Sequence, residues 1–226
     1  MEIIRNYEDF VSCVEDLGFM AFSDILPGWT SLNQRTLSDQ WHTGEPETDP
    51  WQWKDRAALE KRLAFGCLLN GHKGFVSKKW YPVFYRAYHP SDSFEERWEN
   101  GQIKQTVYRV WQLFYEGSSL STDDIRKAVG VTKKQGAGAV DTALKILQQE
   151  YQITVSGNRR KINAKGEPYG WPSNTYDRVK DWATEEWLGA ADLTRRTAQL
   201  KILEAVLSQC QNPDERKVAK TLGLLS

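Results

Sequence analysis

Apolar residues at helical spacing predict three short amphipathic helices in the middle of the chain. The first has its apolar face on Val107, Val110, Trp111 and Phe114, at positions i, i+3, i+4 and i+7. The second begins at Ser121, whose side chain can form a capping box with Asp124, and ends at Gly130. The third follows Gly136. Its inward face is predicted to consist of Val140, Ala143, Leu144 and Leu147, and its outward face of Asp141, Thr142, Lys145, Gln148 and Gln149.

A strand and a basic hairpin are predicted directly after these helices. Ile153 and Val155 alternate with Thr154, which is the period of a strand. Gly157-Asn158 is typical of a tight turn, and three cationic residues follow it at 159–161. The order predicts a winged helix-turn-helix over residues 104–176, a common module for docking on duplex DNA.

The N-terminal part is predicted to be mostly helical and rich in aromatic residues. We expect a helix at 6–17, a loop over 19–40, and a helix that begins after Asp49 at Pro50 and runs to Leu69. A short strand at 75–77 and helices at 79–88 and 94–100 complete this part.

Helices are also predicted at the C-terminal end, at 177–188, after Thr194 and after Asn212. The last two resemble the opening of a second helix-turn-helix. The pattern therefore predicts an α+β, mainly helical protein with three parts: an N-terminal segment (1–103), the winged helix (104–176) and a C-terminal helical element (177–226).

Composition places the chain among ordinary globular proteins. Hydrophobic residues make up 40% of the 226 positions, but ten Trp residues are an unusual number. The longest apolar run, Leu63 to Leu69, is too short to cross a membrane, and the first residues do not resemble a signal peptide. Cys13, Cys67 and Cys210 are isolated, which favours a reducing cytoplasm.

Charge is distributed unevenly, although 30 Lys and Arg balance 30 Asp and Glu. Residues 126–165 hold nine basic and two acidic residues, a net charge of +7, whereas residues 1–60 hold four basic and twelve acidic residues, a net charge of −8. A basic helix and hairpin attract phosphates. Alternatively, the hairpin is solvated and faces the acidic N-terminal part, or the winged helix binds protein.

The residues expected at DNA come from the third helix and the hairpin. We expect Lys145, Gln148 and Gln149 to approach base edges or backbone, and Arg159, Arg160 and Lys161 to contact phosphates. Three further lysines extend this basic set: Lys133, Lys134 and Lys165.

Three short motifs resemble those of the AlkZ-like winged-helix family, and more closely its shorter AlkZ-related branch. They are Asp49-Pro50-Trp51-Gln52-Trp53-Lys54-Asp55-Arg56, Phe65-Gly66 with Gly74-Phe75-Val76-Ser77, and Gly166-Glu167-Pro168-Tyr169-Gly170-Trp171. The resemblance covers roughly residues 5–190. Its known members are bacterial DNA glycosylases that act on alkylated or crosslinked bases, so it implies winged helices that line a DNA-holding concavity.

This chain departs from the family's catalytic pattern. The resemblance implies a Gln-apolar-Gln or Gln-apolar-Asp motif after the first helix, where a polar pair positions the attacking water. The matching stretch, residues 18–24, contains Asp24 but no Gln. The leading hypothesis is therefore a DNA-binding protein related to DNA repair that recognises damage or DNA structure. The alternative is a divergent glycosylase in which Asp24 or Asp49 acts as the catalytic carboxylate.

The segment 41–53 concentrates side chains that could form a site. Trp41, Trp51 and Trp53 could hold a flipped base. The alternative interpretation is that the Trp residues fill the core and that Asp49 caps a helix, and we favour it for Trp51 and Trp53. No metal site or cofactor is predicted, because paired His or Cys ligands and a phosphate-binding loop are missing. A third hypothesis is an interaction scaffold that binds protein through the Trp-rich face.

Overall fold

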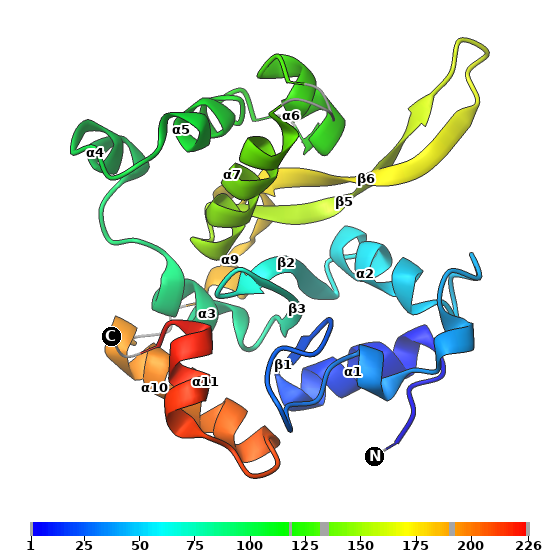
Figure 1. Ribbon diagram of the computed structural model, residues 1–226, viewed down its shortest axis with the longest axis vertical. Helices are drawn as coiled ribbons and strands as arrows, with labels where there is room; N and C mark the ends of the chain where they lie inside the picture. The colour runs from blue at the N-terminus through cyan, green and yellow to red at the C-terminus, as the bar shows by residue number, and fades with distance from the viewer. Residues whose placement is uncertain (1, 118, 132–135, 190–192, 225–226) are drawn as a thin grey trace.

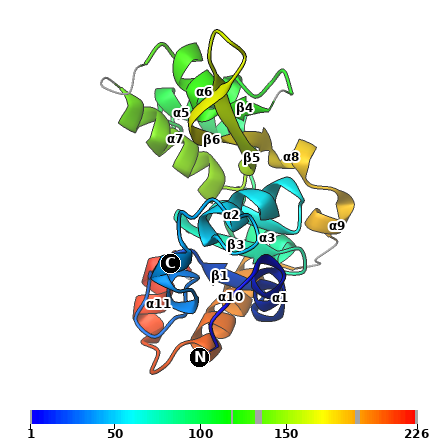
Figure 2. The same cartoon turned by 90° about the vertical axis from the view of Figure 1, so that its right-hand side faces the viewer.

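The computed structural model describes residues 2–117, 119–131, 136–189 and 193–224, and it is α+β and mainly helical, as predicted. The chain forms two lobes (Figures 1 and 2). The lower lobe contains the N- and C-terminal elements, and the upper lobe contains the elements from α4 to β6, with a long hairpin projecting from it.

A three-stranded antiparallel sheet lies at the centre of the lower lobe. It consists of β1 (Phe19–Ala21), β2 (Leu63–Leu69) and β3 (His72–Ser77), in the order β1-β3-β2. Side chains of a strand alternate between the two faces. Accordingly, Met20 and Phe75 belong to one buried cluster, and Phe19 and Val76 belong to the other. The sheet therefore separates two apolar cores.

The first face is covered by α1 (Tyr7–Leu17) and α2 (Pro50–Leu59), with two 3-10 turns between them, η1 (Asn33–Arg35) and η2 (Ser38–Gln40). Two predictions were wrong here. The helix that begins at Pro50 ends at Leu59, and the apolar run expected to continue it is strand β2. The expected loop at 19–40 begins with strand β1.

The second face is covered by α3 (Tyr81–Tyr88), α10 (Arg195–Gln209) and α11 (Glu215–Leu222). Thr194 caps α10 as predicted, whereas the cap of α11 is Asp214, two residues after Asn212. The helix predicted over 177–188 is two single turns, α8 (Val179–Trp182) and α9 (Glu185–Leu188).

The upper lobe contains the three helices and the hairpin that were predicted, and one short strand that was not predicted. It contains α4 (Phe94–Glu99), α5 (Gln105–Gln112), β4 (Leu120–Ser121), α6 (Thr122–Ala128), α7 (Ala137–Gln149), β5 (Ile153–Ile162) and β6 (Pro168–Arg178). The predicted capping box is present, because the Ser121 hydroxyl accepts from Asp124 N and the Asp124 carboxylate accepts from Ser121 N. Strands β4, β6 and β5 form a second antiparallel sheet in that order.

The hairpin β5–β6 is longer than predicted. Gly157-Asn158 is not a turn, because Gly157 pairs with Thr175 within the ladder and the register shifts beside it. Gly157 has φ 154°, a conformation that favours glycine. The reversal lies at residues 163–167, where Gly166 N donates to Asn163 O. The basic residues 159–161 are therefore on the strand and not after its turn.

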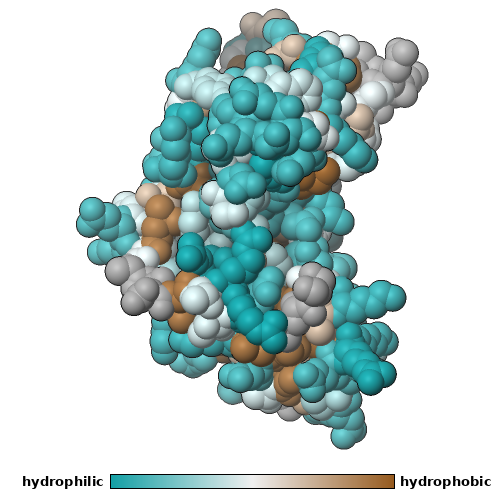
Figure 3. All heavy atoms as spheres, turned by 90° about the vertical axis from the view of Figure 1, so that its left-hand side faces the viewer, coloured by the Kyte–Doolittle hydropathy of each residue, from teal (hydrophilic) through white to brown (hydrophobic). Residues whose placement is uncertain are grey.

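The face on the α4 side is mostly hydrophilic, with apolar residues in separate areas (Figure 3). Scattered apolar residues of this kind are normal on a protein surface. Within the described ranges, no helix combines the length and apolarity needed to cross a membrane.

Candidate functional site

A cavity of about 310 Å³ lies where the hairpin meets α2. Its lining from the lower lobe consists of Phe22, Trp51, Lys54, Phe65 and Lys73. Its lining from the upper lobe consists of Thr122, Asp123, Arg126, Trp171, Pro172, Ser173 and Asn174. Cavities that bind small molecules are about 300–1,000 Å³, so this one is large enough for a single compact group.

Aromatic rings form one side of the cavity. The ring centroids of Phe22 lie 6.3 Å from Trp51 and 5.8 Å from Phe65. His42 lies between the lobes, with its ring 4.9 Å from Trp51 and 6.1 Å from Trp171. Trp171 is 72% exposed, so a large flat ring is held at the cavity with most of its surface in solvent. Flat aromatic faces of this kind are suited to stacking on a nucleobase.

A buried lysine lies in this aromatic wall. Lys54 is only 7% exposed, and its Nζ lies 4.5 Å from the centroid of Trp51 and 2.6 Å from Oδ1 of Asp55. Burial lowers the pKa of the Lys54 amine below its usual range, and the charge of Asp55 opposes this effect. A buried ion pair is costly to desolvate, so the pair marks a candidate functional site.

The opposite side of the cavity is polar and held by ion pairs. Arg126 pairs with Asp141 at 2.7 Å, and Lys161 pairs with Asp123 at 3.4 Å. The Ser173 hydroxyl also donates to Asp123 at 2.8 Å. These contacts connect helix α6 to α7 and to the hairpin, and they fix the upper wall of the cavity.

The basic residues of the hairpin are exposed, but they do not all face the same way. Arg159 lies 3.4 Å from Asp124, and both Arg159 and Lys161 point toward α6. Because side chains alternate along a strand, Arg160 points away from α6. Lys165 is exposed at the end of the hairpin, and Lys133 and Lys134 lie outside the described residues.

The expected outward face of α7 is partly wrong. Gln148 is buried, where its amide accepts from Cys67 N and donates to Leu144 O. Gln149 donates to the side chain of Asn70 at 2.8 Å. Lys145 is exposed and lies beside Gly71. This side of α7 packs on the β2–β3 turn of the lower lobe, so the Gln148 amide does not face solvent as we expected.

Asp49 is a helix cap, as the alternative interpretation predicted. The residue is completely buried, and its carboxylate accepts backbone hydrogen bonds from His42 and Gly44 at 3.0 Å and from Trp51 at 2.9 Å. Asp24 is exposed, accepts a hydrogen bond from the Ser31 hydroxyl, and does not line the cavity. A catalytic role for either carboxylate stays a prediction.

The three tryptophans of the segment 41–53 have different positions. Trp53 is core, as we favoured: it is fully buried, stacks on Phe10 with a centroid distance of 5.4 Å and donates to Glu47 O. Trp51 is half-buried and lines the cavity, so the core interpretation was wrong for it. Trp41 packs edge-on against Phe22 beside the cavity.

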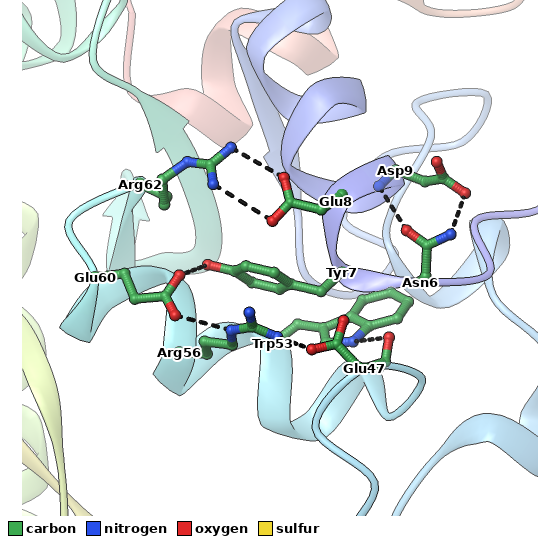
Figure 4. Close-up of polar contacts among 9 residues, drawn as sticks. All are labelled: Asn6, Tyr7, Glu8, Asp9, Glu47, Trp53, Arg56, Glu60 and Arg62. Carbon is green, nitrogen blue, oxygen red and sulfur yellow. Dashed lines mark hydrogen bonds and ion pairs between the residues drawn. The ribbon is translucent and has the colours of Figure 1, made fainter.

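A polar network holds the outer side of α2 against α1 (Figure 4). The Tyr7 hydroxyl donates to Glu60 at 2.8 Å, and Arg56 contacts both Glu60 at 2.9 Å and Glu47 at 2.7 Å. The Arg56 guanidinium also lies 3.9 Å from the Tyr7 ring centroid. Burial and the bond to Glu60 raise the pKa of Tyr7. The network fixes helix α2, from which Trp51 and Lys54 line the cavity.

Four residues line the cavity although they were not predicted as site residues: Phe22, Lys54, Phe65 and Lys73. One signal was available, because Trp51 and Lys54 are three residues apart and therefore share a face of a helix. No local sequence pattern indicated that Trp171, on the hairpin, would line the same cavity as helix α2. No group of three or more His, Cys, Asp or Glu side chains among the described residues could hold a metal ion.

Searches of curated proteins and of solved structures gave no match. A family model described as AlkZ related matches residues 4–223, which includes both lobes and all of the cavity lining. The chain therefore belongs to the AlkZ-related family.

Proposed function

We propose that the protein binds duplex DNA where the hairpin and α2 meet, and that the cavity holds one unstacked nucleotide. The observation that carries this proposal is the cavity itself, with aromatic rings on one side and basic side chains around it. Base-recognising enzymes and binders stack an extruded base between aromatic side chains and pay the cost of unstacking it. Membership in the AlkZ-related family supports a role related to DNA repair.

The upper lobe has the element order of a winged helix, α5-β4-α6-α7-β5-β6. The side-chain amides of Gln148 and Gln149 form hydrogen bonds within the protein, so we do not propose that they contact base edges. The exposed cations of the hairpin are the better candidates for phosphate contacts. Contacts of this kind position a protein on DNA without reading its sequence, which fits recognition of damage or shape.

The first test measures fluorescence anisotropy with plain, nicked and alkylated duplexes across a salt series. Replacing Arg159, Arg160 and Lys161 together by Ala should reduce the salt dependence by about one unit for each lost phosphate contact. A matched control replaces Arg196, Lys201 and Lys217 by Ala, which removes the same charge from exposed positions on α10 and α11, far from the hairpin in Figure 1. Equal slopes for the two variants would refute the hairpin as the phosphate-binding element.

The same samples distinguish the other hypotheses. Alkali-labile cleavage of the alkylated duplex would make the protein a glycosylase, and loss of cleavage in Asp24→Asn would identify Asp24 as its carboxylate. Binding without cleavage supports a non-catalytic protein that recognises damage or structure. The absence of salt-sensitive binding would favour the interaction scaffold.

A further inference from the structure

Lys54 is buried beside aromatic rings, and a lysine that only binds phosphate does not require such an environment. Its Nζ lies 4.5 Å from the Trp51 centroid and 5.9 Å from the Phe65 centroid, and the residue is 7% exposed. A lysine that binds phosphate acts as a hydrated point charge. Lys73, which lines the same cavity, is exposed and suits that role. Lys54 is therefore placed for chemistry at its amine.

Charged groups on several elements surround this amine. Asp55 lies within hydrogen-bond distance on α2, Lys73 faces it from β3, and Asp123 and Arg126 line the far wall of the cavity from α6. Burial and the positive charge of Lys73 both lower the pKa of Lys54, while Asp55 and the more distant Asp49 raise it. A desolvated lysine beside a proton acceptor is the usual form of a nucleophilic amine that attacks carbonyl groups.

We propose that Lys54 captures abasic sites in DNA by forming an imine with the C1′ aldehyde of the ring-opened deoxyribose. The inference rests on the proposed function, because the DNA must first place the base-free sugar in the cavity. An abasic nucleotide has no base to fill the aromatic cavity, so its sugar can lie deeper, beside the Lys54 amine. Its aldehyde is the electrophile that an amine nucleophile requires.

The groups at the cavity and the sugar supply every atom and proton of this step. Asp55 accepts a proton from the Lys54 ammonium, and the free amine attacks C1′ to form a carbinolamine, its proton passing from nitrogen to oxygen. Asp55 then returns its proton to the C1′ hydroxyl, which leaves as water while the nitrogen electron pair forms the C=N bond. The product is a protonated imine and a carboxylate, with no oxidant or reductant required.

The test is reduction of the imine by borohydride, which converts it to a stable protein–DNA adduct. A duplex with one abasic site should give an adduct with the wild-type protein, and a duplex with a tetrahydrofuran abasic analogue, which has no aldehyde, should not. Peptide mapping of the wild-type adduct by mass spectrometry should place the DNA on Lys54. Mapping needs no variant and remains decisive if a substitution at Lys54 prevents folding.

Two variants complete the design. Lys54→Arg keeps the charge but cannot form the imine, and it should lower adduct yield at least about tenfold, whereas the control Lys201→Arg, at an exposed position on α10, should change it by less than about twofold. Anisotropy with the tetrahydrofuran duplex, measured for each variant, separates a loss of the nucleophile from a loss of DNA binding. Thermal unfolding of each variant checks that the fold is retained.

The other possible outcomes would refute either the inference or the proposed function. An adduct that maps outside Lys54, or that persists in Lys54→Arg, would overturn the assignment of the nucleophile. Binding of the tetrahydrofuran duplex without any adduct from the abasic duplex would overturn the inference and leave the proposed function standing. No binding of either duplex would overturn the proposed function, and the inference with it.

Discussion

Replacement of Asp49 by Ala should destabilise the fold strongly. The carboxylate of Asp49 is completely buried and accepts hydrogen bonds from three backbone N–H groups, those of His42, Gly44 and Trp51. A buried N–H group that loses its hydrogen-bond partner costs about 1–3 kcal/mol of stability. Because the loop at 42–44 is exposed, water can reach part of the site in the variant and satisfy some of these N–H groups. The expected loss in the free energy of unfolding is therefore about 3–4 kcal/mol.

Thermal unfolding followed by circular dichroism measures this loss. For a chain of this size, each kcal/mol lowers Tm by about 2–4 °C, so Asp49→Ala should lower Tm by about 6–16 °C. Asp49→Asn retains one acceptor oxygen and should lose about half as much. The control is Asp214→Ala, which removes an exposed cap with one bond to Lys217 N at 3.0 Å and should cost about 1 kcal/mol.

The result that would refute this argument is an Asp49→Ala protein with a Tm within about 2 °C of wild type. If such a protein also lost cleavage of damaged DNA, the carboxylate would be catalytic and the cap would be incidental.

Two further predictions concern packing and pH. Gly74→Ala should lower the free energy of unfolding by about 1–3 kcal/mol, because a Cβ there would lie 2.8 Å from the Met20 carbonyl oxygen. Gly138→Ala, at an open helical position, should raise it by up to about 1 kcal/mol. The midpoints of urea unfolding should therefore shift in opposite directions for the two variants. The hydroxyl and the backbone N–H of Ser93 donate to the Glu96 carboxylate and lower the pKa of Glu96 below the usual 4.5. The stabilisation by the Glu96 carboxylate is therefore present above pH 4.5 and is lost as the pH falls through its folded-state pKa. Glu96→Gln should therefore be less stable than wild type at neutral pH and equally stable in strong acid. A difference in stability that persists in strong acid would contradict a role for the ionised Glu96 carboxylate.

Local patterns were sufficient to predict most helices and the second half of β3, but not strands β1 and β2 of the lower lobe. The helical spacing and the capping box at Ser121 predicted α5, α6 and α7 near their observed positions. Strand β2 was mistaken for helix because both of its faces are buried, which removes the polar alternation that identifies a strand. Strand β1 has three residues and is defined only by pairing with β3, so a local pattern could not reveal it.

The errors at the candidate site have a different origin, which is the packing of each helix against other elements, including those of the other lobe. Gln148 lies at a position where a polar residue normally faces solvent, but the lower lobe supplies Cys67 N as its partner. Lys54 lies at a helical position typical of an exposed lysine, but it is buried beside the rings of Trp51 on the same helix and Phe65 on β2. Helical periodicity describes one helix at a time, so it cannot indicate which exposed positions a second lobe will cover.

Helix α2 connects the stability of the protein to the geometry of the cavity. The same helix is capped by Asp49 and held to α1 through the contacts of Arg56 and Glu60 with Tyr7, and it presents both Trp51 and Lys54 to the cavity. His42, whose backbone N–H bonds to the Asp49 cap, also contacts Trp171 on the hairpin. A substitution that loosens the cap should therefore change how the two lobes meet as well as lower stability. Loss of DNA affinity in Asp49→Ala would be evidence for this connection only if affinity falls at temperatures where the variant is still folded.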